Sequence, residues 1–165
     1  MGAQLVTEEP VLIRIVIPGE PKGVARGRSV GVVNKATGKA SARVYTPAAT
    51  RTEAGVIRMY AEQAMAGRPP LPGPIDLRIA FYKAIPASMP KKYRVDALTG
   101  ILLPLTKPDF DNTAKFVDQF KGIVWHDDAH VTDHVSGKRF SERPMTVFEI
   151  RTMPGFRGWP IGKAK

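Results

Sequence analysis

Two short acidic segments carry the residues most able to do chemistry. The first, residues 107–115, reads Lys-Pro-Asp-Phe-Asp-Asn-Thr-Ala-Lys, and the second, residues 125–128, reads Trp-His-Asp-Asp. Carboxylates this close together repel one another unless they are solvated, protonated or neutralised by a cation. Their hard oxygen atoms suit Mg²⁺ or Mn²⁺. We therefore expect a divalent metal site, which could bring carboxylates and a phosphodiester together for hydrolysis.

The spacing indicates which groups share this site. Pro108 favours an extended backbone before it, and residues two apart in an extended chain point to the same side, so Asp109 and Asp111 should lie together. From position 112 the apolar residues follow a helical period, which places Lys115 on the same stripe as Asp111. Asp128 is expected to join Asp109 and Asp111 as a metal ligand, and Lys115 to stabilise negative charge in the transition state.

Asp128 is expected to enter the site from the start of a strand. The β-branched residues after it favour a strand over residues 129–140. Alternation on that strand predicts that Ala129, Val131 and Val135 face the core, while Asp128 shares the other face with His130.

The same acidic residues also have a purely structural interpretation. Asp109 or Asp111 can be a helix N-cap, Lys115 its ion-pair partner at i+4, and Asp127 with Asp128 a solvated turn. Spacing alone leaves both interpretations open, because short acidic patterns occur often by chance.

Three other kinds of site are disfavoured. An EF-hand would need Asp or Asn at position 113 and Gly at position 114, where Thr and Ala stand. His126, His130 and His134 have the spacing of zinc ligands on a helix, but the β-branched residues between them disfavour that helix. A nucleotidyl- or glycosyltransferase that uses Asp-x-Asp is disfavoured by the compact length and the lack of a recognisable Gly-rich nucleotide loop.

The chain as a whole is strongly basic. Its 165 residues include 25 Lys and Arg against 15 Asp and Glu, for a formal net charge of +10. Contacts from Lys and Arg to phosphate supply most sequence-independent affinity for nucleic acid, so a polyanionic partner is expected. No cysteine is present, which excludes disulfides and thiolate nucleophiles. No stretch approaches the length of a membrane span, so we expect an unexported protein without a membrane partner.

A run without acidic residues, 21–52, is a candidate phosphate-binding surface. Within it, Arg28–Val33 and Arg43–Thr46 are expected to be short strands joined by a turn at residues 34–39. The alternative is a merely solvated face, which the lack of any acid in the run disfavours. The candidate DNA-binding residues of the run are Lys22, Arg26, Arg28, Arg43 and Arg51.

Strand and helix patterns predict an α+β fold: a single domain with a mixed β-sheet and a few helices packed on one face. Thr50 and Glu53 fit a capping box at the start of one helix. Residues 1–153 are expected to form the domain, and residues 154–165 a mobile, basic Gly- and Pro-rich tail. The other expected elements are strands at 11–17, 75–82 and 146–153 and helices at 88–98 and 112–122.

The acidic segments resemble the signature of the RusA family of Holliday junction resolvases. The likeness rests on residues 107–112 with Lys115, and on residues 127–131 with Lys138. Earlier segments agree, namely Gly-Glu-Pro-Lys-Gly at 19–23 and Tyr-Thr-Pro at 45–47, and the likeness covers roughly residues 11–153. It implies a homodimeric, Mg²⁺-dependent endonuclease that recognises four-way DNA junctions and makes paired symmetric nicks.

The resemblance also implies roles for single residues. Asp109, Asp111 and Asp128 resemble the metal-binding catalytic acids, Lys115 the catalytic lysine, and Asp127 is an adjacent candidate ligand. Lys138 joins the candidate DNA-binding residues. The implied setting is the cytoplasm of a bacterium or phage-infected bacterial cell, in recombination, repair or phage DNA processing. The alternative is a non-catalytic, basic nucleic-acid-binding protein whose acids are structural.

Overall fold

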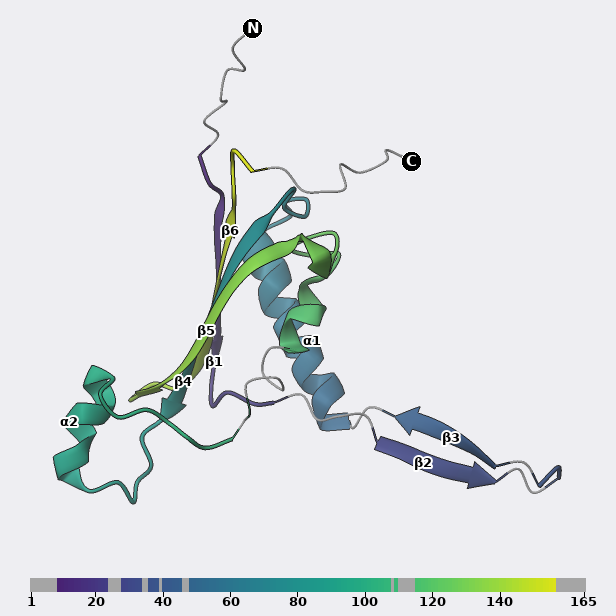
Figure 1. The fold of residues 1–165 in the computed structure, drawn as a ribbon, viewed down its shortest axis with the longest axis horizontal. Helices are drawn as coiled ribbons and strands as arrows, with labels where there is room; N and C mark the ends of the chain where they lie inside the picture. Colours follow the sequence, from purple (N-terminus) through teal and green to yellow (C-terminus); the bar gives the residue numbers. More distant parts are fainter. Residues whose placement is uncertain are drawn as a thin grey trace, which may run out of the picture.

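The computed structural model describes residues 9–23, 28–33, 36–38, 40–45, 48–107, 109 and 115–156. Within these ranges the chain forms a sheet of four strands and a separate sheet of two (Figure 1). The larger sheet is mixed and has helices packed on one face, which confirms the expected α+β fold.

The larger sheet has the strand order β1-β6-β4-β5. β6 is antiparallel to both of its neighbours, whereas β5 runs parallel to β4. A parallel pair requires a long crossover connection, and the residues between β4 and β5 include both acidic segments. The strands are β1 Leu12–Pro18, β4 Ile75–Ala84, β5 Val131–Ser141 and β6 Met145–Thr152.

One face of this sheet, here called the closed face, is covered by α1 (Ala48–Met65) and the 3-10 helix η1 (Lys115–Phe120) (Figure 1). Helix α1 contributes a stripe of Ile57, Ala61 and Met65 at helical spacing. Every second residue of β1 and β4 is buried against it, and each fully buried large side chain contributes about 1.5–3 kcal/mol. The buried residues of these two strands are Ile13, Ile15, Ile75, Leu77, Ile79 and Phe81.

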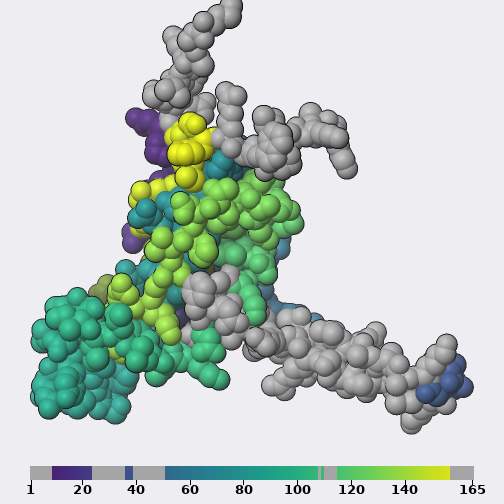
Figure 2. Space-filling view, viewed as in Figure 1, coloured from purple at the N-terminus to yellow at the C-terminus, as the bar shows by residue number. Residues whose placement is uncertain are grey.

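The opposite face, here called the open face, has neither α1 nor η1 over it (Figure 1). Helix α2 (Lys91–Thr99) and the residues beside it stand out from the sheet as a lobe at one end of the molecule (Figure 2). The C-cap of α2 is Gly100, whose φ of 81° is the left-handed conformation that glycine adopts readily. The helix expected at residues 88–98 begins three residues later, because Pro90 is its N-cap.

The two-stranded sheet is a hairpin of β2 (Arg28–Val33) and β3 (Ala40–Tyr45). It extends away from the larger sheet (Figure 1). The expected hairpin is confirmed, although its second strand begins at residue 40 rather than 43.

Local predictions are wrong at the start of α1 and along β5. Helix α1 begins at Ala48, so Thr50 lies inside the helix and cannot be its N-cap; the carboxylate of Glu53 instead pairs with Nζ of Lys22 at 3.0 Å. Val135 is 62% exposed on the open face rather than buried. The reason is a bulge in β5.

The bulge shifts the register between β4 and β5. Ile75 pairs with Val131, but Asp76 pairs with Asp133, so Thr132 is an extra residue. One extra residue moves every later side chain to the other face. The chain before the bulge also differs from expectation, because Asp128–His130 form the 3-10 helix η2 and Ala129 is exposed.

No helix in the described ranges is long and apolar enough to cross a membrane.

Candidate active site

Asp128 is positioned by a buried tryptophan. The indole ring of Trp125 is fully buried and packs edge-on against Phe120, with the ring centroids 5.4 Å apart. Its Nε1 donates a hydrogen bond of 2.8 Å to Oδ1 of Asp128, which satisfies the one polar atom of the buried ring. Oδ2 of Asp128 accepts no hydrogen bond from the described residues. That oxygen is therefore the one open to a cation.

Asp127, the neighbouring residue, has contacts of a structural kind. Its Oδ1 accepts a hydrogen bond of 3.0 Å from the backbone N–H of Ala129 and caps η2. Its Oδ2 lies 2.6 Å from Nζ of Lys121. The hydrogen bond from Lys121, and then that from Ala129, lower the pKa of Asp127. Both oxygens of Asp127 are used within the protein, which favours the structural interpretation for this one residue.

Lys115 and Asp118 lie on η1, close to Asp128. Residues three apart are eclipsed in a 3-10 helix, so Lys115 and Asp118 lie on the same side of η1. Phe116 and Phe120 on η1 are buried in the core. Burial raises the pKa of Asp118, the negative charge of Asp128 raises it further, and the positive charge of Lys115 lowers it in part. The three charged groups therefore lie within electrostatic reach of one another.

The chain just before Asp109 is held by two lysines, here called the lysine clamp. Nζ of Lys83, near the end of β4, donates to the carbonyl oxygen of Lys107 and, at 3.2 Å, to Oγ1 of Thr106. Nζ of Lys138, on β5, donates to the carbonyl oxygen of Thr106 at 3.1 Å. Asp109 itself is exposed. The clamp thus fixes the backbone that leads into the first acidic segment.

Glu20 joins the lysine clamp from the turn after β1. Its Oε2 accepts a hydrogen bond of 2.9 Å from the backbone N–H of Ala84, and its Oε1 lies 3.7 Å from Nζ of Lys83. The side chain of Lys83 is only 12% exposed, so its polar contacts are largely shielded from water. Such contacts are electrostatically stronger in the protein interior than in water. The turn after β1, the end of β4 and residues 106–107 are therefore tied together.

The predicted metal-binding set is described only in part. Asp111 lies outside the described residues, as does Arg26 of the predicted DNA-binding set. Within the part of the chain that the structure describes, no group of three His, Asp or Glu side chains is arranged to hold a metal ion. The convergence of Asp109, Asp111 and Asp128 stays a prediction.

The remaining predicted DNA-binding residues lie on three parts of the fold. Lys22, next to the turn after β1, is paired with Glu53 of α1. Arg51 is exposed on α1, and Arg28 and Arg43 lie on the two strands of the hairpin. Their role in DNA binding stays a prediction.

Sequence comparison agrees with the motifs. A family model described as Endodeoxyribonuclease RusA matches residues 18–151, which include the acidic segments, η1 and the lysine clamp. The chain belongs to the RusA family. As a RusA-family protein it is an endonuclease, a hydrolase that acts on DNA. A relative from Bacillus subtilis (strain 168), named "Uncharacterized protein YqaN", is 33% identical over 144 residues, which cover 84% of this chain and 95% of that protein.

Three residues of this RusA-family site were not predicted from the sequence. Asp118 had a signal, since it lies on the same helical stripe as Lys115. Glu20 is part of the Gly-Glu-Pro-Lys-Gly segment, but its partner could not be identified before the fold placed it beside Ala84. Lys83 had no signal, because a lysine near a strand end is ordinarily solvated.

Proposed function

We propose that this RusA-family protein is a Mg²⁺-dependent endonuclease that resolves four-way DNA junctions by paired symmetric nicks. The observation that carries the proposal is the orientation of the Asp128 carboxylate: Nε1 of Trp125 donates to its Oδ1 at 2.8 Å, and its Oδ2 accepts no hydrogen bond from the described residues. The negative charge of Asp118 lies within electrostatic reach of Asp128 and adds to the attraction of this site for a cation. Their oxygen donors suit Mg²⁺, and Mn²⁺ is expected to substitute.

Each site residue has a separate role in this proposal. Asp109, Asp111 and Asp128 hold the cation, and the hydrogen bond from Trp125 sets the direction of the Asp128 carboxylate. Bound Mg²⁺ would supply polarisation of the scissile phosphate and a lowered pKa for the attacking water. The ammonium group of Lys115 stabilises the negative charge that develops on the phosphate in the transition state.

The proposal also assigns a substrate surface and an assembly. A four-way junction presents two equivalent strands, and a homodimer with two-fold symmetry offers two equivalent sites. Residues 1–153 form the nuclease domain, residues 154–165 a basic tail, and the protein acts in the cytoplasm of a bacterium or phage-infected cell, in recombination, repair or phage DNA processing. Phosphate contacts are assigned to Lys22, Arg26, Arg28, Arg43, Arg51 and Lys138.

Cleavage of a synthetic four-way junction tests the proposal. With Mg²⁺ the protein should make symmetric nicks, and Asp128→Asn should abolish them because it removes a charged ligand, while a gel shift without metal shows unchanged junction binding. Lys115→Ala should slow nicking by about 100-fold and spare binding. The matched control is Asp133→Asn, which neutralises an exposed carboxylate on the same chain segment. Nicking by Asp128→Asn at the wild-type rate would remove the active-site assignment.

A second candidate is a non-catalytic nucleic-acid-binding protein. The observation that favours it is the cap made by Asp127, which gives one acid of the second segment a structural use. It predicts salt-sensitive binding, and no cleavage of junction or linear duplex with either Mg²⁺ or Mn²⁺. One gel that compares the two DNAs with and without metal separates these candidates.

A further inference from the structure

A group of exposed apolar side chains lies in the lobe around α2, residues 85–105, here called the α2 lobe (Figure 2). Helix α2 itself buries Ala97, while larger side chains on it and after it are exposed. A concentration of exposed apolar side chains commonly marks an interaction site. The exposed aliphatic residues of the α2 lobe are Val95, Leu98, Ile101, Leu102, Leu103 and Leu105.

Leu105 differs from the others because the backbone is held on both sides of it. Its own side chain is 94% exposed. Pro104 before it is fully buried, and the proline ring fixes φ there. Thr106 after it is held by the lysine clamp through both Oγ1 and the carbonyl oxygen. A side chain on a fixed backbone loses less conformational freedom when it binds, so Leu105 is a preorganised apolar contact.

The rest of the α2 lobe is also fastened. The backbone N–H of Leu102 donates to the carbonyl oxygen of Asp96 at 2.9 Å, which closes the turn after the helix. Helix α2 contacts the edge strand β5, and a Cβ placed on Gly100 would lie 3.9 Å from Cδ of Arg139 on that strand. The α2 lobe therefore rests on the sheet and presents Leu105 from a fixed base.

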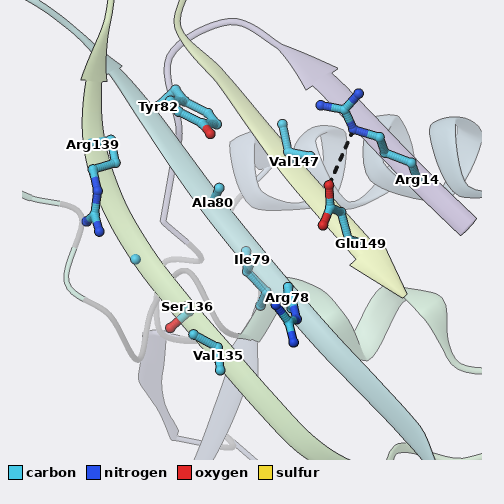
Figure 3. A pocket seen from close by; sticks show the side chains of 11 residues that line it. Arg14, Arg78, Ile79, Ala80, Tyr82, Val135, Ser136, Arg139, Val147 and Glu149 are labelled. Carbon is cyan, nitrogen blue, oxygen red and sulfur yellow. Dashed lines mark ion pairs between the residues drawn. The ribbon is translucent and has the colours of Figure 1, made fainter. Parts of the chain in front are cut away.

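The charge around Leu105 favours a nucleic acid over a protein as its partner. Residues 85–107 hold three Lys and one Arg against a single Asp. On the open face, by contrast, Arg14 is paired with Glu149 of the same chain at 3.8 Å (Figure 3). Interfaces between proteins are depleted in Lys, whereas an excess of Lys and Arg binds phosphates. The α2 lobe thus combines positive charge with apolar side chains, which suits unstacked nucleotides.

Leu105 is also close to the first acidic segment. It lies four residues before Asp109, and four residues span at most about 14 Å between Cα atoms. Nucleotides follow one another at about 3.4 Å along a strand of DNA. The side chain of Leu105 can therefore reach bases within a few nucleotides of the phosphate that the proposed function places at Asp109.

We propose that Leu105 is an apolar wedge that inserts among the bases beside the branch point and so selects a four-way junction over a continuous duplex. The inference deepens the proposed function and rests on it for the substrate. Leucine is among the side chains that insert between base steps and partly unstack them. At a branch point the stack is already interrupted, so unstacking costs less there than within a duplex. The lysine clamp keeps the wedge and the first acidic segment in one continuous run of backbone.

Base unstacking at the branch point tests this inference without cleavage. The probe is 2-aminopurine, a base whose fluorescence is quenched by stacking, placed in turn at each position that flanks the branch point of a synthetic junction in EDTA. Saturation with the full wild-type chain should raise the fluorescence at one or more of these positions. Leu105→Ala should remove most of the rise and weaken junction binding about tenfold, because a buried leucine side chain is lost. Binding to linear duplex should stay within about twofold.

Two further variants serve as controls. Leu105→Met keeps an apolar side chain of similar volume and should keep the fluorescence rise. Leu12→Ala removes the same atoms from a leucine that is 51% exposed on β1, and it should behave as the wild type. Leu12 lies level with the start of β4, because both Leu12 and Asp76 pair with Arg151, whereas the α2 lobe follows the end of β4. Thermal melting confirms that every variant is folded.

The outcomes separate this inference from the nuclease proposal. A wild-type chain that does not bind the junction, a bound junction without any rise, or an undiminished rise with Leu105→Ala overturns the wedge. Equal losses with Leu12→Ala overturn it as well. If Leu105→Ala changes only the association state in sedimentation, the α2 lobe is a protein contact and the wedge is overturned. A wedge response without nicking in Mg²⁺ keeps the inference and removes the nuclease proposal, and nicking without a wedge response does the reverse.

Discussion

Asp128 and Asp109 end two segments of the candidate site that are held in different ways. The segment before Asp128 is fixed by apolar packing, with Trp125, Phe120 and Val124 fully buried in the core. The segment before Asp109 is fixed by polar contacts, in which the lysine clamp donates to backbone carbonyl oxygens. One half of the site is thus continuous with the core, and the other is fastened to the edge of the sheet.

The apolar anchor should therefore determine the stability of the domain, and the polar anchor the position of one segment of the site. Burial of apolar side chains is the main favourable term in folding, so loss of the first anchor should weaken the whole domain. A polar contact contributes about 0.5–1.5 kcal/mol net, so loss of the second should release one segment and leave the fold in place. The two anchors can therefore be broken separately, from the larger effect to the smaller.

Removal of the indole ring should have the largest effect. Trp125→Ala leaves a cavity against Phe120 and removes the hydrogen bond to Asp128, so the free energy of unfolding should fall by about 3–5 kcal/mol. Denaturant unfolding measures the loss. The matched control is Phe156→Ala, because Phe156 is 66% exposed and its removal should leave the free energy of unfolding nearly unchanged. Equal losses in the two variants would show that the ring does not anchor this segment to the core.

Loss of the lysine clamp should be smaller and local. Lys83→Met keeps the side-chain length but removes the ion-pair partner of Oε1 of Glu20 and the donor to the carbonyl oxygen of Lys107, so the free energy of unfolding should fall by about 1–3 kcal/mol. Hydrogen exchange should rise in residues 101–107 and stay unchanged in residues 123–130. Lys92→Met, on the exposed surface of α2, is the control. Faster exchange spread evenly over the domain would contradict a local role.

The sequence predicted the apolar half of this arrangement better than the polar half. Helical spacing placed Phe116 and Phe120 on one stripe, and both are buried. The strands expected at residues 11–17 and 75–82 are confirmed as β1 and β4. These patterns repeat along the chain, so they are readable without a partner. The bulge at Thr132 could not be predicted in this way, because it depends on the register of β5 against β4. The one extra residue places Val135 on the face opposite to the one predicted.

The part of the candidate site that could be predicted is the part whose residue types and spacing are themselves distinctive. The two acidic segments and Lys115 stand out in the sequence because their residue types fit a metal-dependent nuclease. The partners that orient them do not stand out: Lys83, Glu20 and Ala84 lie far from residues 106–107 in sequence and meet only after the sheet forms. Long-range polar contacts of this kind have no local sequence signature, since each partner alone reads as an ordinary surface residue.

The ion pair between Asp127 and Lys121 should have the smallest effect, and its pH dependence identifies it. The pKa of Asp127 is lowered in the folded protein, so its contribution to stability is present above the unfolded value near pH 4 and is lost as the pH falls through the folded value. The pKa of Lys121 is raised by Asp127. The contribution of Lys121 to stability is therefore present below the ordinary lysine pKa near 10, and it is lost as the pH rises through the folded value.

Thermal melting of Asp127→Asn in EDTA measures this contribution without a metal. The melting temperature should lie slightly below that of the wild type at neutral pH, because exposed ion pairs contribute little. The difference should close in acid once the wild-type carboxylate is protonated. Asp96→Asn, which removes a carboxylate with no ion pair among the described residues, should melt like the wild type throughout. A difference for Asp127→Asn that persists unchanged in acid would mean that its cap on η2, rather than its charge, is what stabilises the turn into β5.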